Sequence, residues 1–120
     1  MQEFDIVLAT VVSAPAELQG LEDLLDGRDV YLAGTKTAFI VLDNSGDPAV
    51  RAAIEKTGCA VIANATRHGL QGGLYYSISQ CMKYALEHYR FRSFLKVDPD
   101  SLITGFGLAG ALRDYFDGHP

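Results

Sequence analysis

The amino-acid sequence predicts an α/β fold in which helices cover both faces of a parallel sheet. Short apolar runs alternate with amphipathic stretches along the whole chain. Such alternation calls for parallel strands that are joined by right-handed crossovers. Polar clusters follow the apolar runs, and ligands bind beyond the carboxyl ends of strands in such sheets. The length of 120 residues suits one domain, 1–120.

The first part of the chain contains two apolar runs and one amphipathic stretch. Residues 6–12 are continuously apolar and rich in β-branched side chains, as in a strand buried on both faces. Helical spacing of three leucines predicts a helix over 16–26, and no element is assigned to 27–37. A second buried strand is predicted over 38–42. The three leucines are Leu18, Leu21 and Leu25.

The second part continues the alternation. Asp47 and Pro48 predict a helix start, because an N-cap side chain precedes a proline at the first helical position. Gly58 is well placed to end that helix. The remaining elements follow from apolar periodicity. They are a strand over 59–63, a loop over 64–73, a helix over 74–89, a strand over 94–97 and a helix over 107–116.

Composition excludes several classes of protein. The net charge of −5 argues against a partner bound through nucleic-acid phosphates, so no nucleic acid is expected. No apolar run reaches the roughly 18 residues that a transmembrane segment needs. Cys59 and Cys81 lack the spacing of a metal site, which indicates buried thiols in a reducing, cytoplasmic compartment.

Two acids follow the last predicted strand. Residues two apart in an extended chain point to the same side, so Asp98 and Asp100 can face one cation, with Pro99 stiffening the backbone between them. Two carboxylates leave positions on Mg²⁺ for water and phosphate oxygens. The alternative is a strand end with two solvated acids and a turn proline.

Two further polar segments follow strands. Asp43 stands at the tip of the second strand, where its carboxylate could accept hydrogen bonds from a base or ribose and contribute little packing. In the glycine-containing loop 66–73, Arg67 could pair with a diphosphate. The loop matches neither a dinucleotide fingerprint nor a P-loop. The alternatives are a turn at Asp43 and a flexible connection at 66–73.

Together, these segments resemble the nucleotide-binding half of family 2-like glycosyltransferases, which have the Rossmann-like GT-A fold. The resemblance covers nearly the whole chain and depends on the order and spacing of its parts. The parts are Ile40-Val41-Leu42-Asp43-Asn44-Ser45, then Val61-Ile62-Ala63-Asn64, the loop that opens the long helix, and Phe94-Leu95-Lys96-Val97-Asp98-Pro99-Asp100.

The resemblance implies a donor site for a nucleotide-diphosphate sugar and a cofactor, Mg²⁺ or Mn²⁺. The cation would neutralise the leaving diphosphate as the glycosidic bond breaks. The implied site residues are Thr10 in the nucleotide pocket, Asp43 at the base, Arg67 and Gly69 near the diphosphate, Asp98 at ribose or metal, and Asp100 as the principal metal ligand.

The sequence departs from this family after the Asp-x-Asp segment. There the family places its acceptor site and catalytic base, whereas only residues 101–120 follow here. We therefore expect a donor-binding half without its acceptor half, with the acceptor unknown. The uncovered side of the sheet would leave apolar surface, which favours a homo-oligomer.

Three other classes of protein are alternatives to this family. A non-catalytic nucleotide- or sugar-binding domain is the main alternative, because no acceptor half is present. An adhesion module of the von Willebrand A type has Asp-x-Ser-x-Ser after its first strand, whereas residues 43–47 end in Asp47 and follow the second strand. A phosphoacceptor receiver domain needs an acidic pair after the first strand, which 10–12 do not supply.

Overall fold

The computed structural model describes residues 1–64, 70–101 and 107–118, and in these ranges it contains one parallel sheet. The strand order is β3-β2-β1-β4, so β1 lies between β2 and β4. This confirms the predicted α/β fold, a Rossmann-like parallel sheet with helices. The strands are β1 (Gln2–Val12), β2 (Thr37–Asp43), β3 (Ala60–Ala63) and β4 (Tyr89–Lys96).

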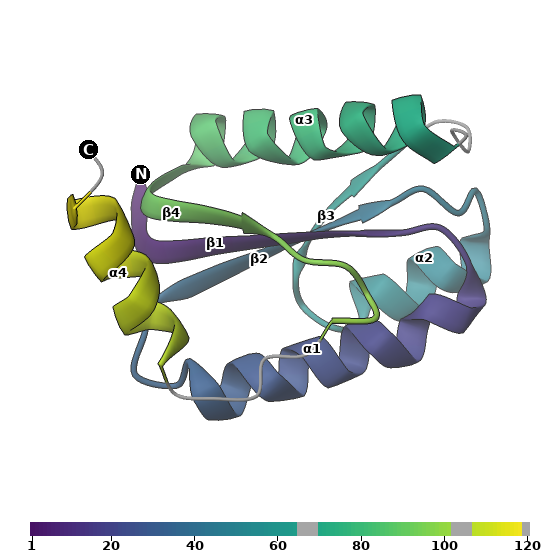
Figure 1. Cartoon of the computed structure of the whole chain (residues 1–120). Coiled ribbons are helices and arrows are strands. Elements are labelled where there is room, and N and C mark those ends of the chain that lie inside the picture. The colour runs from purple at the N-terminus through teal and green to yellow at the C-terminus, as the bar shows by residue number, and fades with distance from the viewer. Residues whose placement is uncertain (65–69, 102–106, 119–120) are drawn as a thin grey trace.

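The helices lie on both sides of this sheet (Figure 1). Helices α1 and α2 join β1, β2 and β3 in turn and cover one face, whereas α3 carries the chain to β4 across the opposite face. The apolar side of α4 packs against the same cluster as α1 and α2. The helical elements are the 3-10 turn η1 (Pro15–Glu17), α1 (Leu18–Tyr31), α2 (Pro48–Glu55), α3 (Leu70–His88) and α4 (Leu108–Gly118).

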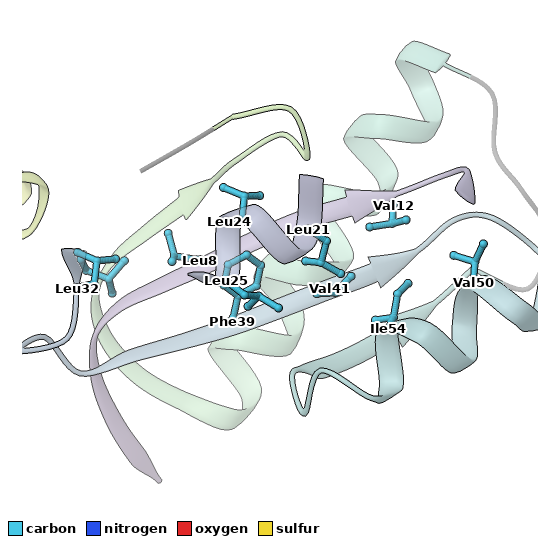
Figure 2. Packing of buried hydrophobic residues seen from close by; sticks show 11 residues of the cluster. Leu8, Val12, Leu21, Leu24, Leu25, Leu32, Phe39, Val41, Val50 and Ile54 are labelled. Atoms are coloured by element: carbon cyan, nitrogen blue, oxygen red, sulfur yellow. The ribbon is translucent and has the colours of Figure 1, made fainter. Parts of the chain in front are cut away.

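The core consists of two apolar clusters separated by the sheet. Because side chains alternate along a strand, β1 supplies Leu8 and Val12 to the α1 side and Val7 and Ala9 to the α3 side. All four are essentially fully buried, which explains why the strand is continuously apolar. Figure 2 shows the first cluster, in which leucines of α1 pack over Phe39 and Val41 of β2.

Local signals located the start of α2 and the turn after it. The Asp47 carboxylate accepts a hydrogen bond of 2.8 Å from the Ala49 N–H, as expected for an N-cap. Gly58 has φ = +76°, a conformation that glycine adopts without strain. The sequence prediction was less accurate elsewhere: α1 continues to Tyr31, α3 starts at Leu70 rather than at 74, and β4 starts at Tyr89 rather than at 94.

Cys81 lies on the inner side of α3 and is fully buried in the second cluster. Desolvation raises the pKa of its thiol from 9.0 to about 12. The folded protein therefore keeps this thiol protonated at a pH where the unfolded chain ionises it.

We predict that this thiol makes the protein less stable as the pH rises from 9 towards 12. Below pH 9 both states hold the proton, and above it only the folded state does, so the free energy of unfolding falls. Urea unfolding of the wild type and Cys81→Ala across this range measures the effect. The free energy of unfolding should fall less steeply with pH in the variant than in the wild type. Equal slopes would show that the Cys81 thiol does not cause the loss of stability.

Candidate functional site

A cleft of about 490 Å³ lies at the carboxyl ends of β1 and β4. The chain adds β2 and β3 on one side of β1 and then places β4 on the other side, so the strand order reverses between β1 and β4. Open α/β sheets bind ligands at such a reversal. The residues that line the cleft are Val11, Ser13, Glu17, Asp98, Pro99 and Asp100.

The segment from Asp98 to Ser101 forms a β-turn. The Val97 N–H donates to the Ala9 carbonyl at 2.8 Å, and the Ser101 N–H then donates to the Asp98 carbonyl at 2.9 Å. Pro99 occupies the second turn position, for which its fixed φ is suited. The expectation of an extended chain here was wrong, because the turn bends the backbone. Asp98 and Asp100 nevertheless line the same cleft.

Asp98 has a cationic partner in the structure. The Lys96 ammonium forms an ion pair with Asp98 Oδ1. The Lys96 side chain is 28% exposed and that of Asp98 is 57% exposed, so solvent screens the pair. Any metal ion that binds Asp98 therefore competes with this ammonium group.

Glu17 brings a third carboxylate to the cleft. Its Oε1 accepts hydrogen bonds from the Ser13 N–H at 2.7 Å and the Ala14 N–H at 3.1 Å. These N–H groups stand where the first helical segment begins, which is where dinucleotide-binding folds hold a pyrophosphate. Glu17 already occupies them. The sequence analysis missed this residue, whose signal is an acid at the third position of a helix start.

A chain of amides and hydroxyls, of which Asn44 and Ser77 are buried, joins the strand ends. Asn44, only 6% exposed, donates from Nδ2 to Ser13 Oγ at 3.1 Å and accepts at Oδ1 from Asn64 Nδ2 at 2.8 Å. Asn64 Nδ2 also donates to Ser77 Oγ on α3, at 3.0 Å. This relay links the segments after β1, β2 and β3 to α3, and it fixes the hydroxyl of Ser13, a residue that lines the cleft. The sequence marked Asn44 only as a turn residue.

Asp43 has a structural role at the end of β2. The residue is 4% exposed, and its Oδ1 accepts hydrogen bonds from the Ser45 N–H at 2.9 Å and the Ser45 hydroxyl at 2.6 Å. This is an Asx-type turn. The expectation that the Asp43 side chain contributes little packing was therefore wrong.

Thr10 does not reach the described cleft. Thr10 is fully buried, and its position in β1 places it on the face with Leu8 and Val12. Within the described residues its Oγ1 has no hydrogen-bond partner. Ser13, beyond the strand end, lines the cleft instead. Arg67 and Gly69 lie outside the described residues.

The described residues offer few possible metal ligands at the cleft. Within 1–64, 70–101 and 107–118, no group of three or more His, Cys, Asp or Glu side chains could hold a metal ion. One or two carboxylates are what Mg²⁺ takes from a protein beside phosphates and water. Asp98 and Asp100 supply two carboxylates to the cleft, which is too few for an all-protein cage.

A comparison with known proteins identifies a solved structure with a similar fold. No protein-family model matches the chain, and no curated protein matches it. Among solved structures, residues 1-349 of S. aureus TarS, a glycosyltransferase, superpose with a TM-score of 0.60 at 16% sequence identity. The match covers 96% of this chain and 33% of that chain, so the chain spans about a third of its length. Over this length the chain therefore shares the α/β fold of that structure.

No helix in the described ranges has the length and apolar character to cross a membrane.

The Asp43 geometry gives a stability prediction. Asp43→Ala removes the acceptor of two Ser45 hydrogen bonds, and we expect the free energy of unfolding to fall by about 1–3 kcal/mol. Asp43→Asn keeps an oxygen at Oδ1 and should retain most of the stability. Urea denaturation compares both variants with the wild type, and equal losses in both would show that the negative charge, not the acceptor, is what matters.

Proposed function

We propose that this chain is the donor-binding part of a glycosyltransferase and holds a nucleotide-diphosphate sugar in the cleft between β1 and β4. Mg²⁺ or Mn²⁺ would link the diphosphate to Asp98 and Asp100. The observation that carries this proposal is the cleft itself, which lies where the strand order reverses and is lined by acidic residues. The glycosyltransferase-like fold supports it.

Electrostatics favour a cation in this cleft. Glu17, Asp98 and Asp100 line it, and the whole chain carries a net charge of −5. Lys96 offsets one of these carboxylates. A diphosphate would meet repulsion here unless a divalent cation stood between it and the acids. When bound, such a cation stabilises the charge that develops on the leaving diphosphate.

The residues of this chain then have distinct roles in the proposal. Asp100 is the principal ligand of the cation, and Asp98 contacts the metal or ribose while it shares its charge with Lys96. Ser13, oriented by Asn44, offers a hydroxyl at the cleft wall. Asp43 remains a predicted contact of the base. Arg67 and Gly69 remain predicted contacts of the diphosphate.

A non-catalytic nucleotide- or sugar-binding domain is the second candidate. It is favoured by the engagement of two cleft carboxylates, because Glu17 accepts backbone N–H groups and Asp98 pairs with Lys96. A general base must reach the acceptor hydroxyl with a free basic oxygen. Donor turnover with a broad acceptor panel separates transfer from binding alone.

The metal role predicts a specific loss on substitution of Asp100. Asp100→Asn keeps the size of the side chain but removes the charge, and we expect Mn²⁺-dependent affinity for a nucleoside diphosphate to fall by about tenfold or more. Calorimetric titration of UDP, GDP, CDP and dTDP, with Mn²⁺ or with a chelator, measures this. Asp114→Asn on the exposed side of α4 is the matched control. The metal role is wrong if Mn²⁺ improves the binding of none of the four.

The ion pair predicts the opposite effect for Lys96. Lys96→Met removes the ammonium that competes for Asp98, so the protein should bind Mn²⁺ more tightly than the wild type. Lys83→Met, on the exposed side of α3, makes the same change in net charge away from the cleft. Electron paramagnetic resonance of free Mn²⁺ gives both affinities. Equal gains in the two variants would show a net-charge effect only.

A further inference from the structure

The backbone of α1 touches the Asp98–Asp100 turn at Gly20. A Cβ added to Gly20 would lie 2.7 Å from the carbonyl carbon of Pro99 and closer still to its oxygen. Such distances are essentially never seen for real Cβ atoms. The obstacle is backbone rather than the end of a flexible side chain, so it cannot rotate away. There is no room for even one methyl group between α1 and this turn.

The turn is also tied to the sheet at one end and closed on itself. The Val97 N–H is bonded to the Ala9 carbonyl of β1, which ties the segment before Asp98 to the sheet. The Ser101 N–H closes the turn onto the Asp98 carbonyl, and the ring of Pro99 fixes one backbone angle inside it. A substituent at Gly20 would therefore push against Pro99 in the middle of the turn, strain the closing Ser101–Asp98 hydrogen bond and displace the two carboxylates.

Gly20 and Glu17 belong to the same side of the helix start. Residues three apart are neighbours on a helix surface, so Glu17 at the cleft and Gly20 under the turn present one continuous face. The close approach at Gly20 brings Asp98 and Asp100 into the cleft that Glu17 also lines. Without a glycine here, α1 and the turn would have to separate.

We propose that Gly20 is a positioning residue for this site: the bare backbone of α1 seats the turn and sets where its carboxylates stand. The effect of Gly20 on ligand binding rests on the proposed function. The close contact between Gly20 and Pro99 is a property of the fold and does not depend on it. Alanine normally favours a helix over glycine, by up to about 1 kcal/mol. A loss of function in Gly20→Ala would therefore not come from the intrinsic helix preference of the new residue.

The experiment compares Gly20→Ala with Gly110→Ala. Gly110 lies in α4, where an added Cβ would meet only Arg113 Nη2 at 3.7 Å, an ordinary contact. We expect Gly20→Ala to weaken Mn²⁺ binding about tenfold, to speed exchange of the Ser101 amide and to leave the Val97 amide protected. Gly110→Ala should change none of these. Unchanged Ser101 exchange in Gly20→Ala would overturn the proposal.

The two proposals can fail separately. If the wild type binds no Mn²⁺, with or without a nucleoside diphosphate, the proposed function fails, and amide exchange at Ser101 still decides whether Gly20 seats the turn. Pro99→Gly loosens the turn, so adding it to Gly20→Ala should restore part of the lost binding. If Gly20→Ala fails to fold, the double variant should recover folding. A double variant that recovers neither Mn²⁺ binding nor folding would contradict the proposed role of Gly20.

Discussion

The position of β1 is the constraint on which the rest of the structure depends. The strand pairs with β2 on one side and β4 on the other, and helices cover both of its faces. A shift of one residue in its register would exchange its two buried faces, so the register is fixed by packing on both sides. Ala9 pairs with Lys96, and its carbonyl then accepts a hydrogen bond from the Val97 N–H. These contacts fix the end of β4 and thereby the position of Asp98. The geometry of the cleft thus depends on the burial of β1, although only the end of that strand lines the cleft.

Polar groups at the carboxyl edge of the sheet fall into two sets with different consequences. Asn44, Asn64 and Ser77 satisfy one another inside the protein, as buried polar groups must. Glu17, Asp98 and Asp100 line the cleft, where Lys96 pairs with Asp98 and two backbone N–H groups bond to Glu17. The first set holds the strand ends in place. The second set gives the cleft its acidic character, on which the proposed function rests.

Sequence reasoning succeeded where the signal was local and failed where it was not. The helix start at Asp47 and the buried strand 38–42 depend on neighbouring residues, and both agree with the structure. The early start of β4 depends on its pairing with β1 from Tyr89 onward, a tertiary effect that the sequence pattern did not reveal. Asp98 and Asp100 were brought to one cleft, but by a turn rather than by an extended chain.

Gly20, which the sequence analysis missed, and Thr10, which it placed in the nucleotide pocket, both depend on segments that only the fold brings close. Gly20 gives no local signal that a distant turn will lie against it. The position of Thr10 in β1 decides its face, and packing rather than residue type decides that this face is closed to ligand. Such contacts become visible only when the register of the sheet is known.

Glu17 shows how one side chain can redirect the binding chemistry of a common fold. Rossmann-type sheets hold phosphates on the free N–H groups at the start of the first helix. In this chain the Glu17 carboxylate takes the N–H groups of Ser13 and Ala14, so a phosphate finds acceptors and negative charge where donors would otherwise stand. An anionic ligand in the same cleft then needs positive charge from elsewhere, and the acids that follow β4 are suited to bring it in as a divalent cation. The proposed metal dependence is thus a consequence of the capped helix start as much as of Asp98 and Asp100.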